Sequence, residues 1–320
     1  MAAQRLTVGL GYRYDSAYLR DRVVQVHGFD VEFKPDLAPS GAGQRYVAPA
    51  SMFESMASDP PYDVGELAFA TYVQAVDQGK DFTAIPVFTS RYFEHGQLFV
   101  RRDGPIRSPR DLEGRRVGIG CFSVNPAVWL RGTLTHQYDV ATERITWVTN
   151  RREYFPEFQV PRRYSVESAP EGKSFGDLAA AGGIDAVSRS GSTDALRPLF
   201  ENPYPEIAQY YEQNGIFPIN TVLMLPKRTI EKAAGFVDAL FDAFRRALDL
   251  YREDVRRGAQ RPDHSGLDLL RLEREAGVSL PDHGMSANKQ NIRMMVQYCY
   301  EQGVIRRLYE PEELFVLHGS

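Results

Sequence analysis

Short apolar runs alternate with helical patterns along most of the chain. Several of these runs have the length and composition of buried strands, and each is followed by a polar loop or by a helix. They are Leu6–Leu10, Val31–Phe33, Tyr62–Leu67, Ala84–Phe88, Arg116–Gly120, Ile145–Val148 and Ile184–Val187. Strands that alternate with helices in this way predict an α/β fold with parallel sheets covered on both faces.

Helix signals stand between and after the strands. Ser108 and Asn125 are each followed by proline, which is typical of the first turn of a helix. Apolar residues at three- and four-residue steps predict a long amphipathic helix over Ile230–Asp254, and a second helix is predicted over Ala287–Gln302. Residues 151–171 are rich in Pro and Arg and predict a long loop.

The order of these elements predicts two lobes. The first set of strands ends near Val100, and a second set of strand–helix units begins after it. We expect the late helices to return and pack on the first lobe. Lobe one then consists of residues 1–100 and 225–320, and lobe two of residues 101–224, with a ligand cleft between them. A chain of 320 residues is long enough to bury two such cores.

Composition narrows the classes of partner. The chain has 38 Lys and Arg against 42 Asp and Glu, and this balance argues against a nucleic-acid surface, which needs a dense basic patch. No stretch reaches the ~18 uninterrupted apolar residues of a membrane span, and Met1–Tyr14 lacks a signal-peptide pattern. We therefore expect a cytoplasmic protein with neither nucleic acid nor membrane as partner. A homo-oligomer is compatible with the sequence.

One acid, one histidine and two arginines follow one another between residues 62 and 132. They are Glu66, Arg91, His95 and Arg131. Open α/β sheets bind ligands at the carboxyl ends of their strands. The arrangement therefore suits capture of a small anion in the cleft between the lobes.

Longer motifs in the same region resemble those of the 4,5-dihydroxyphthalate decarboxylase family. The most specific are Pro-Val-Phe-Thr-Ser-Arg at 86–91 and Ile-Phe-Pro-Ile-Asn at 216–220, and the resemblance extends from about Asp63 to Phe244. It implies a type II periplasmic-binding-protein-like fold. It also implies a lyase of aromatic compound catabolism, a decarboxylase that acts on a hydroxylated aromatic (di)carboxylic acid bound in the cleft.

The chain differs from the family pattern at three places. Thr221 stands where the family has histidine, Gly120-Cys121-Phe122 replaces a Pro-Glu-Tyr motif, and Gly65 replaces serine. Thr221 and Gly120-Cys121-Phe122 favour an alternative, a non-catalytic substrate-binding protein of the ABC-transporter type that takes a small anionic or aromatic solute.

For a decarboxylase, three residues are the first candidates. Arg91 ends a buried strand and suits the grip of a carboxylate through its bidentate fork; a hinge or surface salt bridge is the alternative. His95 suits a general acid or hydrogen-bond donor, or a structural histidine. Glu66 suits a proton donor, or a structural counter-ion of Arg91 or Arg13. We take His95 and Glu66 as the catalytic pair.

Further candidates for substrate binding follow other strands or begin a helix. Ser123 and Asn125 precede a helix whose free N–H groups favour an anion, although simple capping also explains Asn125. Arg189 complements the second carboxylate that the resemblance implies, and Asn220 suits a ring hydroxyl or a backbone cap. The full set is Tyr12, Arg13, Arg91, Ser123, Asn125, Ser188, Arg189 and Asn220.

Three expectations concern residues without a ligand role. Arg131 lies six residues inside a predicted helix, and we expect it at the surface. Cys121 is expected to be a small core residue, since no base stands beside it in sequence. Six scattered histidines and two distant cysteines lack the spacing of a metal site. We therefore expect no metal and no cofactor.

Overall fold

The first sheet of the computed structural model contains the strands in the order β2-β1-β3-β11-β4. The structure describes residues 5–11, 13–35, 50–189, 192–259 and 269–316. Within these, the sheet is built from β1 (Leu6–Leu10), β2 (Val31–Pro35), β3 (Val64–Ala68), β4 (Phe82–Arg91) and β11 (Ile219–Pro226). β1 pairs in parallel with β2 and β3, as the alternating pattern predicts.

The expectation of parallel sheets is wrong for β11. This strand lies between β3 and β4 and is antiparallel to both. The physical reason is topological, because β11 brings the chain back from the other lobe and enters the sheet from the opposite end. Its eight residues are all buried, so its sequence has no alternation that would mark its direction.

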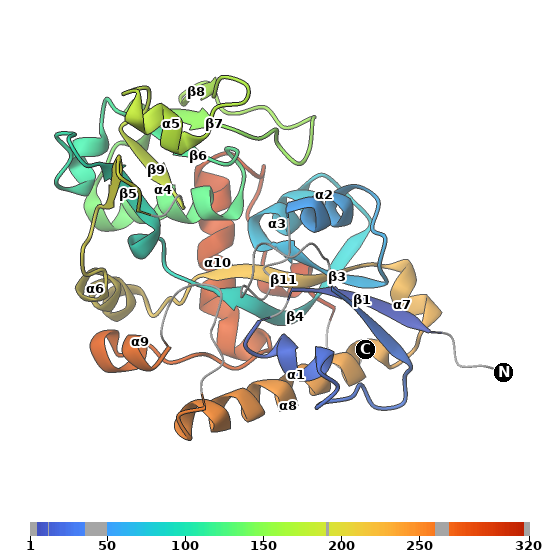
Figure 1. Cartoon of the computed structure of the whole chain (residues 1–320). Coiled ribbons are helices and arrows are strands. Elements are labelled where there is room, and N and C mark those ends of the chain that lie inside the picture. The colour runs from blue at the N-terminus through green and yellow to red at the C-terminus, as the bar shows by residue number, and fades with distance from the viewer. Residues whose placement is uncertain (1–4, 12, 36–49, 190–191, 260–268, 317–320) are drawn as a thin grey trace.

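The second sheet has the order β10-β5-β9-β6-β7-β8. β6, β7, β8 and β9 are parallel where they pair, whereas β5 is antiparallel to β9 and to β10. Its strands are β5 (Leu98–Arg101), β6 (Arg116–Ile119), β7 (Thr146–Thr149), β8 (Ser165–Ser168), β9 (Ala186–Ser188) and β10 (Leu196–Pro198). Figure 1 shows the two sheets as the centres of two lobes, joined by the segment between β4 and β5 and by the return to β11. The division into lobes at residues 100 and 224 stays a prediction.

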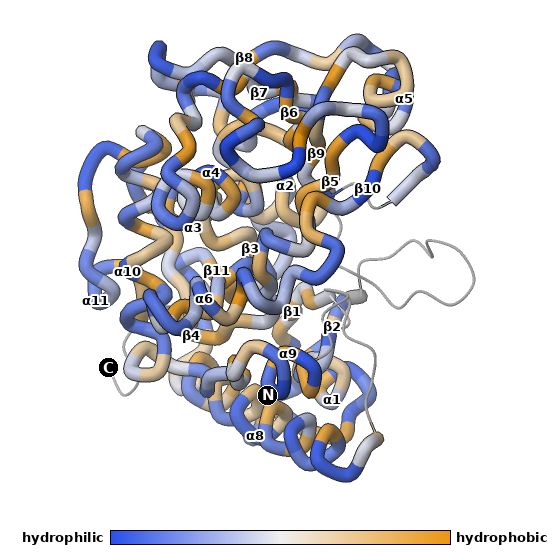
Figure 2. The backbone as a smooth tube through the Cα atoms, turned by 90° about the vertical axis from the view of Figure 1, so that its left-hand side faces the viewer, coloured by the Kyte–Doolittle hydropathy of each residue, from blue (hydrophilic) through white to orange (hydrophobic). Residues whose placement is uncertain are grey.

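Helices cover both sheets. In the first lobe they are α1 (Ser16–Arg20), α2 (Ala50–Ser58), α3 (Phe69–Asp77), α7 (Arg228–Lys232), α8 (Phe236–Arg256), α9 (Leu269–Ala276), α10 (Met285–Glu301) and α11 (Pro311–Leu314). In the second they are α4 (Asn125–Tyr138), α5 (Phe175–Ala180) and α6 (Tyr204–Asn214), with 3₁₀ turns η1 (Glu94–Gln97), η2 (Pro109–Leu112) and η3 (Thr142–Arg144). The late helices therefore pack on the first lobe, and Figure 2 shows the mixed apolar and polar course of α8 beneath β1 and β4.

Three local expectations need correction. The helix predicted over Ile230–Asp254 is divided into α7 and α8 at Gly235, whose φ of 76° is left-handed and ends helical continuity. The predicted loop 151–171 contains the edge strand β8, which is largely exposed and so lacks an apolar pattern. Asn125 does not cap α4, because Val124 holds the N-cap position and Asn125 is already helical.

α4 of the second lobe packs closely on α10 of the first. A Cβ atom on Gly132 would lie 2.0 Å from the ring of Tyr298, so only glycine allows this approach. Arg131, expected at the surface, is fully buried here; it donates to the Phe122 carbonyl at 2.6 Å and to Gln302 at 2.8 Å. The helix presents its inner face to both lobes, which a short sequence pattern cannot reveal. No helix among the described residues is long and apolar enough to span a bilayer.

Candidate functional site

The first lobe contains a buried ion pair between β3 and the segment after β1. Glu66 on β3 accepts two hydrogen bonds from the Arg13 guanidinium, each 3.1 Å long, and a third from the Gly11 backbone N–H at 3.2 Å. Both side chains are almost fully buried. Glu66 is therefore the counter-ion of Arg13, the alternative that the sequence left open. Tyr12, which lies between Gly11 and Arg13, falls outside the described residues.

The crossover between the lobes is held by two asparagines. Asn125 accepts from the Ala70 N–H at 2.9 Å and donates to the Asn220 side chain at 2.7 Å. Asn220 donates in turn to the carbonyl of Tyr92 at 3.3 Å. The structure thus brings Asn125 and Asn220 together, and their side chains connect α3, α4 and β11 with the crossover. Thr221, at the family's histidine position, bonds the hydroxyl of Thr89 at 2.8 Å.

A cavity of about 310 Å³ lies at the carboxyl ends of β6, β7 and β9. This is where ligands bind in open α/β sheets. Its polar lining residues are Asn150, Arg151, Ser188 and Arg189, and its apolar lining residues are Ile119, Val124, Pro126, Ala127 and Phe175. The N-terminus of α4 faces it, and the helix dipole favours an anion there.

Arg189 is the predicted residue that the structure places most clearly at this cavity. Its guanidinium lies 4.0 Å from the centre of the Tyr92 ring, and its backbone N–H donates to the Gln97 carbonyl at 2.7 Å. Its φ of 63° is left-handed, a conformation that costs a non-glycine residue roughly 1 kcal/mol. Strain of this kind collects at functional sites.

The sequence analysis missed Arg151, which it placed only in the predicted loop 151–171. Arg151 follows β7 and lines the cavity. A Cβ atom on Gly120 would lie 2.5 Å from its Nη2, so the absence of a side chain at Gly120 gives the guanidinium its place. Among the described residues, neither Arg151 nor Arg189 has a carboxylate oxygen within 4.0 Å. The position of Arg151 shortly after β7 was the sequence signal that could have identified it as a candidate site residue.

Ser123 does not offer its hydrogen-bonding groups to a ligand. The Glu153 carboxylate accepts from the backbone N–H of Phe122 at 2.7 Å and from the N–H and hydroxyl of Ser123 at 3.0 and 2.6 Å. An internal carboxylate thus occupies the anion position that the sequence assigned to the ligand. Ser188 differs, because its buried hydroxyl has no hydrogen-bond partner among the described residues.

Arg91 is buried away from the residues that line the cavity. It donates to the Phe217 carbonyl at 2.8 Å and to the side chain of Asn288, and its guanidinium lies 5.2 Å from the centre of the Phe88 ring. Burial lowers its pKa to about 10. These contacts connect β4 with α10. They occupy the guanidinium group that the sequence analysis assigned to a substrate carboxylate.

The structure does not bring His95 and Glu66 together. His95 Nε2 is 2.6 Å from the side-chain oxygen of Gln137 on α4, and the ring packs among Phe93, Tyr138 and Tyr210. Burial lowers the pKa of His95 to about 4, although the Gln137 contact opposes this shift. The imidazole is therefore neutral at pH 7 and cannot act there as a charged acid.

Glu94, the residue beside His95, is a buried acid without a partner. Its side chain is 2% exposed, and neither carboxyl oxygen has a hydrogen bond among the described residues. Burial raises its pKa to about 8, and the charge of Arg189 opposes the shift. Cys121 is a buried core thiol, as expected, with its pKa raised to about 12 by burial.

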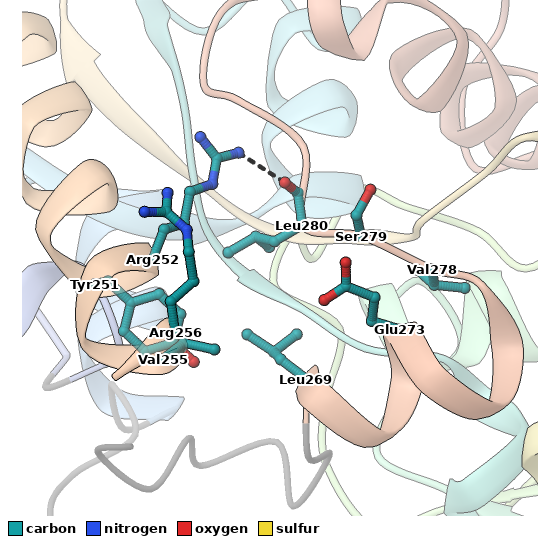
Figure 3. Close-up of a pocket in the computed structure, with 9 residues that line it drawn as sticks. All are labelled: Tyr251, Arg252, Val255, Arg256, Leu269, Glu273, Val278, Ser279 and Leu280. Atoms are coloured by element: carbon teal, nitrogen blue, oxygen red, sulfur yellow. Dashed lines mark hydrogen bonds between the residues drawn. The ribbon is translucent and has the colours of Figure 1, made fainter. Parts of the chain in front are cut away.

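Other cavities lie away from the strand ends. One of about 250 Å³ lies between α8 and α9 (Figure 3), where Arg252 donates to the Leu280 carbonyl at 2.7 Å. None of the residues lining it belongs to a predicted site. Among the described residues, no group of three or more His, Cys, Asp or Glu is placed to hold a metal ion.

Relatives place the chain in a family. A 4,5-dihydroxyphthalate decarboxylase of Comamonas testosteroni is 28% identical over 98% of this chain and 97% of its own length. A 4,5-dihydroxyphthalate decarboxylase of Pseudomonas putida is 32% identical over 57% of this chain and 69% of its own. The chain belongs to the 4,5-dihydroxyphthalate decarboxylase family. This confirms the resemblance seen in the motifs, while no protein-family model matches the chain.

Solved structures confirm the fold of this family member. The alkanesulfonate-binding protein SsuA of Xanthomonas axonopodis pv. citri, bound to MOPS, aligns with a TM-score of 0.57 over 99% of both chains at 14% identity. The periplasmic aliphatic sulphonate binding protein SsuA of Escherichia coli aligns with a TM-score of 0.54 over 100% of this chain and 94% of its own. The predicted two-lobed, type II periplasmic-binding-protein-like fold is thus correct.

Proposed function

We propose that this protein is a decarboxylase of a hydroxylated aromatic dicarboxylic acid, which binds at the cavity between the strand ends of the second lobe. The observation that carries the proposal is the pair Arg151 and Arg189, which line one cavity together with five apolar residues. An aromatic ring that carries carboxylates matches this combination. The membership of the family gives the reaction class.

The chemistry assigns different surroundings to the two carboxylates. As carbon dioxide leaves, negative charge moves from the carboxylate oxygens into the ring. A guanidinium on the reacting carboxylate would therefore stabilise the ground state more than the transition state. We assign Arg151 and Arg189 to the carboxylate that is retained. The carboxylate that is lost then lies against apolar lining residues such as Val124 and Phe175.

The test measures carbon dioxide release and heat of binding together. The purified protein is given 4,5-dihydroxyphthalate, phthalate and 3,4-dihydroxybenzoate in turn. We expect release from the first compound only, because phthalate lacks the ring hydroxyls that stabilise the protonated ring, and 3,4-dihydroxybenzoate is the product, which has already lost the departing carboxylate. We expect 3,4-dihydroxybenzoate to bind with a Kd within about tenfold of that of 4,5-dihydroxyphthalate, a difference below about 1.4 kcal/mol, because it keeps the carboxylate assigned to Arg151 and Arg189.

Matched variants locate the site. Arg151→Ala and Arg189→Ala should each raise the Kd at least about tenfold, since a charge-assisted hydrogen bond contributes about 1.5–3 kcal/mol. Arg152→Ala removes a neighbouring arginine that does not line the cavity and should leave the Kd unchanged. Equal effects of all three variants would contradict the placement of the site. Tight binding without release of carbon dioxide would instead support the non-catalytic binding protein.

A further inference from the structure

The cavity and the ion pairs described above do not account for the burial of Glu94. It begins η1, the turn through which the chain passes from β4 of the first lobe to β5 of the second. Its carboxyl group is buried, and both oxygens are without a hydrogen-bond partner among the described residues. Buried polar groups in native proteins are almost always paired, so an unpaired carboxyl indicates a group kept free for another purpose.

The turn that carries Glu94 and the strand after it are hydrogen-bonded to two residues that line the cavity. Leu98 pairs with Ser188 across β5 and β9, and Arg189 donates its backbone N–H to the Gln97 carbonyl at 2.7 Å. Ser188 and Arg189 line the cavity, and the Ser188 hydroxyl is also buried without a partner. Two unpaired polar groups thus stand on adjacent segments at one edge of the site.

Burial keeps the proton on Glu94. The charge of Arg189 lowers the pKa of Glu94 and opposes this effect, but burial is the larger cause. An ionised carboxylate without a donor would be costly at this depth. The burial that raises the pKa of Glu94 to about 8 therefore leaves the acid protonated at neutral pH.

The other candidate acids already have hydrogen-bond partners within the protein. Glu66 is paired with Arg13, and Glu153 accepts three hydrogen bonds from Phe122 and Ser123. His95 is neutral and bonded to Gln137. Of the acids considered for this reaction, Glu94 alone combines a proton with oxygens that have no partner among the described residues.

We propose that Glu94 is the catalytic acid of the decarboxylase, an inference that rests on the function proposed above. Its proton passes to the ring carbon that bears the departing carboxylate. The C–C bond then breaks, carbon dioxide leaves, and the electron pair of that bond restores the aromatic ring. Glu94 is left as a carboxylate and regains a proton from water. The sum is aromatic carboxylate plus a proton, giving the arene and carbon dioxide.

The experiment compares wild type with Glu94→Gln, Glu94→Asp and the control Glu113→Gln. Carbon dioxide release from 4,5-dihydroxyphthalate gives kcat, calorimetry gives Kd, and incubation of the decarboxylated product in D₂O reports exchange of its ring hydrogen. We expect Glu94→Gln to lower kcat and the exchange rate at least about 100-fold, as general-acid catalysis contributes 10²–10⁴-fold. Its Kd should stay within about threefold, because glutamine keeps the shape and the uncharged state of the acid.

Each remaining outcome has a distinct meaning. Glu94→Asp should keep measurable release, since the acid is retained one methylene further back. Glu113→Gln changes a carboxylate that bonds Ala141 and Arg144, outside the cavity, and should match wild type. If Glu94→Gln still releases carbon dioxide and exchanges the ring hydrogen, the role of Glu94 is overturned while the proposed function stands. Absence of both from wild type would overturn the proposed function, and the role of Glu94 with it.

Discussion

The guanidinium of Arg189 lies 4.0 Å from the centre of the Tyr92 ring, and this contact joins the end of β9 to the crossover between the lobes. A cation over an aromatic face gains roughly 0.5–2 kcal/mol without losing its charge to a carboxylate. The ring therefore holds the arginine at the cavity while leaving its charge available to an anion.

The backbone of Arg189 gives a first prediction. Because its φ of 63° suits glycine, Arg189→Gly should be more stable to unfolding than Arg189→Ala, by about 1 kcal/mol. Both variants lose the guanidinium and its contact with Tyr92, so their difference isolates the backbone. Urea unfolding of the two variants measures it. Equal free energies of unfolding would mean that the left-handed conformation stores no strain.

Gly120 should matter for the ligand and little for stability. A Cβ atom in Gly120→Ala would meet Nη2 of Arg151 at 2.5 Å, and the end of a flexible side chain can move away at small cost. The displaced guanidinium should weaken carboxylate binding about tenfold, or about 1.4 kcal/mol. Calorimetry with 4,5-dihydroxyphthalate tests this. Gly176→Ala is the control, since its Cβ would meet only Ser174 Oγ, at 3.6 Å; a loss of affinity there as large as that in Gly120→Ala would contradict the argument.

The Arg13–Glu66 pair should be costly to break from one side. Glu66→Gln leaves a buried guanidinium without its counter-ion, and removal of one partner of a buried pair typically costs about 3–5 kcal/mol. Arg13→Met combined with Glu66→Leu removes both charges and should cost less than the sum of the two single variants. A double-mutant cycle by urea unfolding measures the coupling. Additive costs would show that the two charges do not stabilise each other.

His95 should make the protein sensitive to acid. Its folded-state pKa of about 4 lies below its ordinary value, so the folded protein binds fewer protons than the unfolded chain between pH 6.5 and 4. Stability contributed by the neutral ring is then lost as pH falls through this window, by roughly 3 kcal/mol in total. Unfolding of wild type and His95→Gln at pH 7 and pH 4.5 tests this. Wild type should lose more stability than the variant, and parallel losses would contradict the prediction.

Glu94 should have the opposite dependence. Its folded-state pKa of about 8 lies above its ordinary value, so the folded protein retains a proton that the unfolded chain has released. Stability should fall as pH rises from about 4.5 to about 8, by up to about 1.4 kcal/mol per pH unit. Glu94→Gln removes this dependence and should be more stable than wild type at pH 8. A variant less stable than wild type there would show that the carboxyl is ionised and solvated.

Motifs at strand ends pointed to Ser188 and Arg189, which line the cavity, and to Arg13 and Glu66, which form a buried ion pair. The reason is that the residue after a buried strand must lie at the sheet edge. The motifs did not distinguish a side chain that faces a cavity from one that is hydrogen-bonded to other residues of the protein. Arg91 bonds Phe217 and Asn288, and Ser123 bonds Glu153, in each case through a partner more than 25 residues away in sequence. Arg151 and Glu94 were missed because neither stands in a recognisable motif.

The sequence by itself determined the class of fold, the order of most strands and helices, and the family, because apolar periodicity and short motifs are local properties of the chain. Only the tertiary structure decided which polar groups remain free. It paired Arg13 with Glu66 and buried Arg131 and Arg91 in the protein's own hydrogen bonds. Among the described residues, it left Arg151 and Arg189 without a carboxylate oxygen within 4.0 Å and Glu94 without a hydrogen-bond partner. The physical reason is that hydrogen bonding and burial depend on segments that meet only when the two lobes fold together.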